Sequence, residues 1–207
     1  MKKFFTFALL CAATAAQASL LSDMAGSLKG VGAIEMDIDQ QKNIALFDEP
    51  IRSRLRIWVC MSGKMRIENL EPFRSLSIFD GEKLARYEFQ NGSWKKLTEA
   101  NPELAKRIFG QMSGVYTGKI DSGEYDVEEK GSSLTLTPKN AAVKNFIEKI
   151  IIETGRDGAK TLAKKITVID ADGDSTAMNI DSCKLLSEEP KIFDTESPEA
   201  NLKGRRP

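Results

Sequence analysis

The sequence contains no histidine among its 207 residues. Histidine titrates nearest to neutral pH, and it is the usual general base and the commonest metal ligand. Its absence excludes Ser-His-Asp and Cys-His catalysis. Carboxylates are numerous, but no spacing among them singles out an acid–base pair. We therefore expect a binding protein and not an enzyme, with no catalytic residues, no metal and no cofactor.

Long apolar runs are also absent. The longest apolar stretch follows two lysines at the N-terminus, is too short to span a bilayer, and ends at Ala16-Gln17-Ala18. This arrangement is typical of a signal peptide with a small-x-small cleavage site. We predict that residues 1–18 are removed and that the protein is periplasmic. Lipidation of Cys11 is the alternative, but Leu10 stands where such a site carries a small residue.

Cysteine is scarce, and only Cys60 and Cys183 remain after cleavage at this site. In an exported protein two cysteines favour a disulfide. We predict a Cys60–Cys183 bond, and two separate buried thiols are the alternative.

Neither sign of charge is in excess, since 30 lysines and arginines balance 30 aspartates and glutamates. Proteins that bind nucleic acid usually carry a basic surface, so we expect no nucleic-acid partner.

Arg52, Arg54 and Arg56 alternate along one segment; they could bind an anionic headgroup, but a solvated strand face is the simpler interpretation. Asp170 to Asp174 has the spacing of calcium-loop acids, yet Ser175 replaces the glycine that such a loop requires. A solvated turn is therefore expected there. We expect a monomer.

Apolar and polar residues alternate with period two in many short segments, which predicts half-buried strands. Turn pairs such as Asp80-Gly81 and Asn91-Gly92 separate them. Even spacing favours an antiparallel meander over βαβ units. The predicted strands are 34–39, 51–61, 64–70, 76–79, 84–89, 124–128, 134–137, 144–153, 164–170 and 176–186.

A helix is predicted to begin at Asn101-Pro102-Glu103, which supplies an N-cap, a first-turn proline and a first-turn acid. Leu104, Ile108 and Met112 then form an apolar stripe. A curved sheet must close or have its concave face filled. This helix is a candidate filler, and its displacement would open a ligand groove; the sequence alone does not separate a groove from an ordinary filled core. Residues 187–207 are rich in proline and charge, and we predict a flexible tail after a domain of residues 19–186.

Two stretches resemble the LolA-type periplasmic lipoprotein carriers. The first is Gly63 to Tyr87, where a strand runs into Pro72 and the next strand ends in Asp80-Gly81. The second is Leu134 to Ile180, which contains Gly155-Arg156-Asp157-Gly158 and an Asp-Gly hairpin. The family has an Arg-Pro step whose arginine helps to latch the lid; this chain has Met61-Ser62 there, so no latch arginine is carried over.

The resemblance implies a β-rich fold, a curved and unclosed antiparallel barrel with a lid of short helices over an apolar groove. It also implies that the groove shields the acyl chains of a lipoprotein or another lipid, received from an inner-membrane transporter and passed to an outer-membrane acceptor. A periplasmic sensor of lipid or envelope stress is the alternative on the same fold. The groove residues expected are Ile57, Val59, Met65, Ile67, Leu76, Ile78 and Leu84, and the lid residues are Leu104, Ile108 and Met112.

Overall fold

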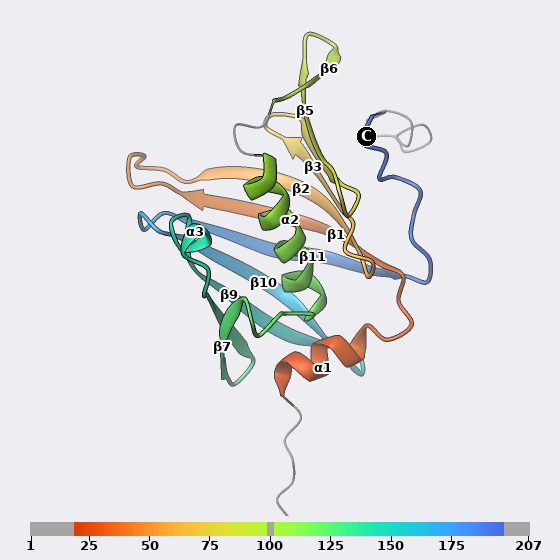
Figure 1. The fold of residues 1–207 in the computed structure, drawn as a ribbon, viewed down its shortest axis with the longest axis vertical. Coiled ribbons are helices and arrows are strands. Elements are labelled where there is room, and N and C mark those ends of the chain that lie inside the picture. The colour runs from red at the N-terminus through yellow and green to blue at the C-terminus, as the bar shows by residue number, and fades with distance from the viewer. Residues whose placement is uncertain (1–18, 99–101, 197–207) are drawn as a thin grey trace, which may run out of the picture.

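The protein is one eleven-stranded antiparallel sheet, seen in a computed structural model that describes residues 19–98 and 102–196 (Figure 1). The strand order is β6-β5-β4-β3-β2-β1-β11-β10-β9-β8-β7, so β6 and β7 are free edges and the sheet does not close. The predicted curved, unclosed barrel is confirmed. The strands are β1 (Ala33–Asn43), β2 (Ile51–Cys60), β3 (Met65–Glu71), β4 (Ser75–Phe79), β5 (Leu84–Gln90), β6 (Ser93–Lys96), β7 (Tyr125–Lys130), β8 (Ser133–Pro138), β9 (Ile147–Asp157), β10 (Lys160–Asp170) and β11 (Ser175–Leu186).

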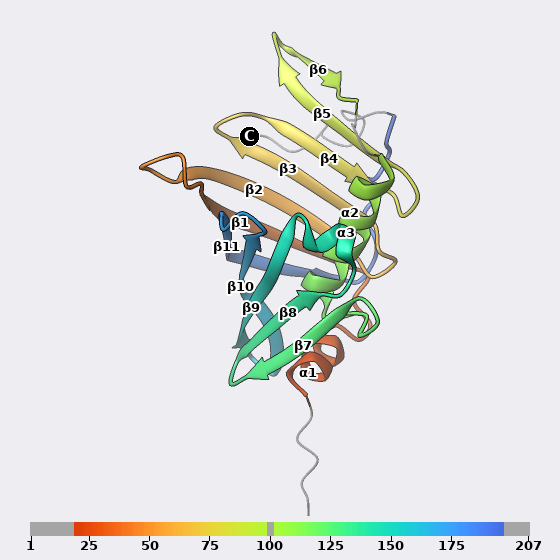
Figure 2. The ribbon, with the colours of Figure 1, turned by 60° about the vertical axis from the view of Figure 1, so that its left-hand side comes forward.

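Three helices accompany this sheet in the described part of the chain, and Figure 2 shows the strands curving around them. The first is α1 (Leu20–Ser27), whose N-cap Ser19 accepts a hydrogen bond from the Ser22 amide and which packs on β10 and β8. The second, α2 (Pro102–Thr117), contacts β2, β4 and β5. The third is the single turn α3 (Ala141–Lys144), beside β8 and β9.

Strand register divides the side chains between two faces, because residues paired across strands point the same way. One row runs across six strands, from Leu84 through Phe79, Met65, Val59 and Ile34 to Leu185. These six side chains belong to the large core that α1 and α2 cover. The concave face therefore carries the main hydrophobic core.

The convex face of β3 to β5 carries a second, smaller core. Leu76, Ile78, Ala85 and Tyr87 pack there with Trp94 and with Phe193 from the C-terminal segment. Residues 187–196, the first half of the predicted flexible tail, lie against these strands. The Arg66 side chain is 1% exposed and donates a 2.9 Å hydrogen bond to the Ile192 carbonyl oxygen. We call residues 187–196 the strap; the predicted signal peptide, like residues 197–207, lies outside the described residues.

The predicted Cys60–Cys183 disulfide is wrong, because both cysteines are free. Cys60 pairs with Ala33 and Cys183 with Met36, on opposite sides of β1 and three residues apart along it. An odd offset puts the thiols on opposite faces of the sheet, with their Cα atoms about 10 Å apart in each of two directions. A disulfide needs Cα atoms within about 7 Å. Burial raises the pKa of Cys60 to about 12 and also raises that of Cys183.

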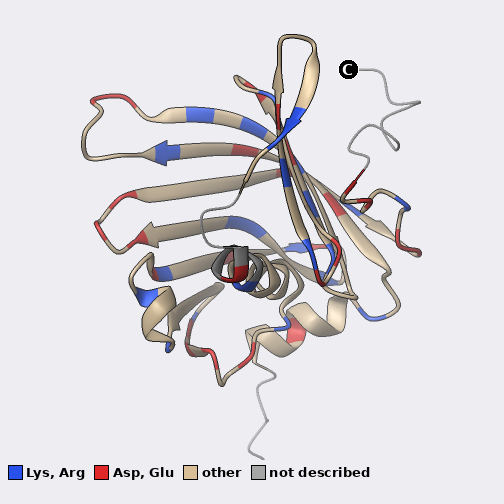
Figure 3. Ribbon diagram, turned by 45° about the horizontal axis from the view of Figure 1, so that its top comes forward, with Lys and Arg blue, Asp and Glu red and all other residues tan. Residues whose placement is uncertain are grey.

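The arginine row lies on the convex face of β2, where aspartates of β1 stand opposite two of its members. Arg56 contacts Asp37 at 2.7 Å, and Arg54 lies 4.0 Å from Asp39 and 3.3 Å from Glu71. Figure 3 shows acidic and basic positions mixed over the strands. These pairings fit the interpretation of the row as a solvated strand face.

Candidate functional site: the concave face and its lid helix

The floor of the candidate site is the apolar concave face of the strands from β3 through β2, β1, β11, β10 and β9 to β8. Its rows of paired residues include Ile67, Ile57 and Met36, and next to them Leu55 and Ile38. Most of these side chains are fully buried, but Ile67, Val168 and Ile180 are partly exposed although they pack against the core. The apolar floor therefore extends beyond the area that α2 covers.

Five of the seven predicted groove residues lie together on this floor: Ile57, Val59, Met65, Ile67 and Leu84. The other two, Leu76 and Ile78, lie on the opposite face. Register pairs Leu76 with Glu68 and Ile78 with Arg66, and the convex cluster holds both apolar side chains. Their placement in the groove is therefore corrected; on β4 the concave face carries Ser75 and Ser77 instead.

Sequence reasoning missed several floor residues. Phe79 is the inward aromatic residue of β4, and its ring lies 4.0 Å from the Cβ position of Gly110 on α2. The alternation of Leu76 and Ile78 indicated a strand, but Phe79 follows Ile78 directly and therefore lies on the opposite, concave face. The β-strands of the last third contribute the remaining floor, from Leu134, Leu136, Ile150, Ile152, Ile166 and Met178.

The lid helix α2 turns its apolar side toward this floor. Phe109, Met112, Val115 and Tyr116 pack against the core, so Met112 occupies the predicted lid position. Ile108 is partly buried but does not join the core, and the side chain of Leu104 lies outside the described residues. The Tyr116 hydroxyl donates to the Met178 sulfur at 3.4 Å, and burial raises its pKa. Tyr116 therefore anchors the lid as a neutral, essentially apolar side chain.

Two glycines bring the end of the lid close to its surroundings. A Cβ atom at Gly114 would stand 2.5 Å from the Lys119 carbonyl oxygen, which no real contact allows. Gly118 has a positive φ of +70°, and a Cβ atom there would lie 2.9 Å from the Cβ of Met24. Only glycine combines positive φ with such close approach at little cost. The C-terminal end of α2 is thus fixed against α1.

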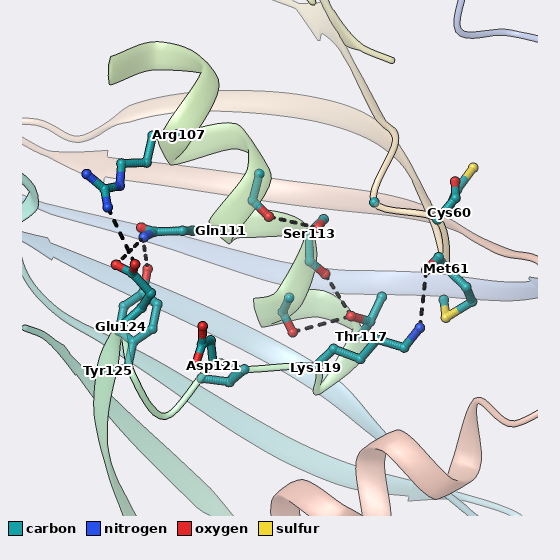
Figure 4. Close-up of a pocket in the computed structure, with 15 residues that line it drawn as sticks. Cys60, Met61, Arg107, Gln111, Ser113, Thr117, Lys119, Asp121, Glu124 and Tyr125 are labelled. Atoms are coloured by element: carbon teal, nitrogen blue, oxygen red, sulfur yellow. Dashed lines mark hydrogen bonds and ion pairs between the residues drawn. The ribbon is translucent and has the colours of Figure 1, made fainter. Parts of the chain in front are cut away.

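A cavity of about 410 Å³ lies at the rim of the lid, between α2, the turn after β2 and the loop before β7 (Figure 4). Polar contacts across it hold the lid. Glu124 lies 3.4 Å from the Arg107 guanidinium and accepts a 3.0 Å hydrogen bond from the Gln111 amide. The Tyr125 hydroxyl donates to Gln111 Oε1 at 3.1 Å. Lys119 Nζ donates to the Met61 carbonyl at 3.1 Å, at the position where the family has its latch step.

These rim contacts are weak in free energy. Arg107, Glu124 and Lys119 are partly or fully exposed, and exposed ion pairs contribute about 0–1 kcal/mol each. The lid is therefore held by apolar packing on one side and by solvated polar contacts on the other. Such a helix can leave the floor if another apolar group takes its place.

Within residues 19–98 and 102–196, no group of three histidine, cysteine, aspartate or glutamate side chains is placed to hold a metal ion. The Asp170-to-Asp174 segment forms the β10–β11 turn, where the Asp174 carboxylate accepts from the Ala45 amide. None of the helices in the described ranges is long and apolar enough to cross a membrane.

Several solved structures are similar to this chain. A structure described as a putative outer membrane lipoprotein-sorting protein domain from Vibrio parahaemolyticus is 10% identical, with a TM-score of 0.50 over 87% of this chain and 97% of that one. A LolA superfamily protein from Nitrosomonas europaea is 12% identical, with a TM-score of 0.48 over 86% and 99%. The Pseudomonas aeruginosa MucA/MucB complex gives 13% identity and a TM-score of 0.40 over 82% and 59%.

No curated protein sequence matches the chain. A family model does match, over residues 56–195, which is more than half of the chain, and its description is outer membrane lipoprotein carrier protein LolA. The matched range runs from β2 to the strap and includes the lid helix, the rim cavity and most of the floor. The chain belongs to the LolA family.

Proposed function

We propose that the protein carries the acyl chains of a lipoprotein or another lipid between the concave floor and α2, within the periplasm. The observation that carries the proposal is an apolar sheet face wider than the helix that covers it. Ile67, Val168 and Ile180 remain partly exposed on this face, although an ordinary core would bury them. An acyl chain would cover these side chains and take the place of lid side chains.

The energetics suit reversible binding. Each methylene group moved from water to an apolar site contributes about 0.8 kcal/mol. Lifting α2 would cost the packing of Phe109, Met112, Val115 and Tyr116 together with the weak rim contacts, and the methylene groups of an acyl chain would offset that cost. Release then needs only an acceptor with comparable affinity for the chain. An inner-membrane donor and an outer-membrane acceptor would complete the route.

The test locks the lid. Gln111→Cys on α2 and Glu124→Cys before β7 replace side chains that touch at 3.0 Å across the rim cavity. A short bis-methanethiosulfonate cross-linker then joins them and can be removed with dithiothreitol. We expect cross-linking to abolish uptake of a fluorescent fatty acid, and reduction to restore it. Native Cys60 and Cys183 have raised pKa values and should react slowly.

The matched control is Lys139→Cys with Asp126→Cys, an ion pair at 3.2 Å of which neither member belongs to the lid. Cross-linking there should leave uptake unchanged. Equal uptake by the open and locked lid, or no uptake by the wild-type protein, would remove the proposed groove and leave a filled core. Native mass spectrometry of protein purified from the periplasm would identify any lipid that it retains.

A further inference from the structure

Five large apolar side chains are exposed in the described part of the chain, and none of them lies in the middle of a strand. Their exposed fractions range from 44% to 90%. They are Leu46, Phe47, Ile51, Phe73 and Phe146.

All five lie at the same end of the sheet. In an antiparallel sheet alternate connections meet at one end, and the β1–β2, β3–β4 and β10–β11 turns share an end with the start of β9. Leu46 and Phe47 lie between β1 and β2, and Ile51 is the first residue of β2. Phe73 lies in the β3–β4 turn, and Phe146 directly precedes β9. Figure 1 shows the β1–β2 and β10–β11 turns side by side, with α3 at the same end.

Hydrogen bonds connect these turns. The Ala45 amide donates to Asp174 at 2.9 Å, and the Ala171 amide donates to the Phe146 carbonyl at 3.1 Å. The tip of β1–β2 is thereby joined to the β10–β11 turn, and that turn to Phe146. We call the five side chains the apolar rim, which is distinct from the rim cavity beside the lid.

The apolar rim borders the part of the floor that the helices leave least covered. The C-terminal end of α2 packs against α1 at the opposite end of the strands, where Lys119 reaches Met61. On the rim side, Val168 and Ile180 are partly exposed. An acyl chain that leaves the floor toward this end would pass between the apolar side chains of these turns.

The charges beside the rim do not form a field of one sign. Lys42 lies 3.8 Å from Asp170, and Lys149 lies 3.1 Å from Glu148. This surface therefore favours binding through the burial of apolar side chains, and not through attraction to anionic headgroups.

We propose that the apolar rim inserts into the interfacial region of a lipid bilayer, so that acyl chains pass between bilayer and floor without crossing water; this rests on the proposed function. A protein partner would need a contiguous, well-packed patch of roughly 800 Å² with its anchors near the centre. Here the apolar side chains stand on separate turns with Asp48, Glu49 and Asp172 between them. A fluid bilayer fits separate protruding tips, and apolar area governs such binding.

The experiment places a reporter on the rim. Phe47→Trp and, as the matched control at the other end of the sheet, Glu82→Trp are mixed with neutral phosphatidylcholine vesicles whose acyl chains are brominated. We expect quenching at position 47. At position 82 we expect none beyond that of the native tryptophans. Salt at 0.5 M should change the result little, because salt screens charges and this binding is apolar. Leu46→Asp with Phe47→Asp should weaken vesicle binding at least tenfold.

Absence of quenching at position 47, equal quenching at both positions, or binding that needs anionic lipid and disappears in salt would each overturn the inference. Uptake of the fatty acid from vesicle-free solution separates this inference from the proposed function. The double aspartate variant should keep that uptake while its transfer of the probe to vesicles slows. If the wild type takes up no probe but position 47 is quenched, the carrier proposal fails and the membrane contact stands.

Discussion

Two apolar patches of this sheet are each covered by one segment of chain, but the covers are fixed in different ways. On the concave face, α2 uses Met112 and Tyr116 against the floor and exposed polar contacts at its rim. On the convex face, the strap uses Phe193 and a buried arginine, whose guanidinium bonds both Glu68 at 2.7 Å and the Ile192 carbonyl. Buried, charge-assisted hydrogen bonds are costly to break, whereas solvated ones are not. The difference predicts that the lid opens more readily than the strap detaches.

The largest expected effect compares one substitution on the two faces. Ile78 is 0% exposed beneath the strap, so Ile78→Glu should lower the free energy of unfolding by about 4 kcal/mol or more, since a buried charge is left unpaired. Ile67 is partly exposed on the floor, so Ile67→Glu should keep a cooperative melt and abolish uptake of the fatty-acid probe. Urea melts and probe titrations of both variants measure the contrast. Unfolding of both alike would show that the floor is an ordinary core.

Removing the charge under the strap should come next. Arg66→Met keeps the aliphatic length but leaves Glu68 and the Ile192 carbonyl without their donor. Breaking a buried pair in this way costs about 3 kcal/mol. Urea denaturation would measure it, and proteolysis should cut within the strap of the variant first. A loss below about 1 kcal/mol would mean that the strap is held no more firmly than the lid.

A smaller effect is expected at the lid. Gln111→Ala removes the amide that joins α2 to Glu124 and Tyr125 across the rim cavity. Because these contacts are partly solvated, the free energy of unfolding should fall by no more than about 1 kcal/mol. Association of the probe should nevertheless become faster, since the closed lid is disfavoured. Stopped-flow fluorescence measures the rate; a slower rate would argue against lid opening before binding.

The smallest expected effect is a pH dependence of the strap. Hydrogen bonds from Ser62 and Lys64 lower the pKa of Glu189 below its usual 4.5. A lowered folded pKa stabilises the folded state above the unfolded pKa, and this contribution is lost as pH falls from about 4.5 through the folded value. Glu189→Gln should therefore flatten the acid side of the stability profile slightly. Thermal melts between pH 3 and 7 would show it, and an unchanged slope would assign the acid sensitivity to other carboxylates.

The sequence predicted the strands well and the two faces less well. Along β2, Leu55, Ile57 and Val59 alternate with polar residues, and the structure buries that face as expected. On β4 the same alternation was assigned to the concave face, but Leu76 and Ile78 face the strap. The alternating apolar residues lie on the concave face in β3 and on the convex face in β4. Both faces can be apolar because the lid covers the first and the strap covers the second.

That change could not be seen in the pattern alone. Period two identifies a strand with one apolar side, but not the side of the sheet to which it belongs. The strap itself is mostly polar in sequence and supplies only Ile192 and Phe193 as apolar anchors. The alternation also gives no sign that Arg66 is buried, since its partner Ile192 lies 126 residues further along the chain.

The separation of the two thiols has a consequence for how the protein can be made. With Cys60 and Cys183 on opposite faces, the folded domain of described residues cannot join these two thiols in a disulfide. Folding then needs neither an oxidising compartment nor a thiol oxidase, and a reducing cytoplasm can yield the same fold. The experiments above, which install new cysteine pairs, can therefore start from protein produced under reducing conditions.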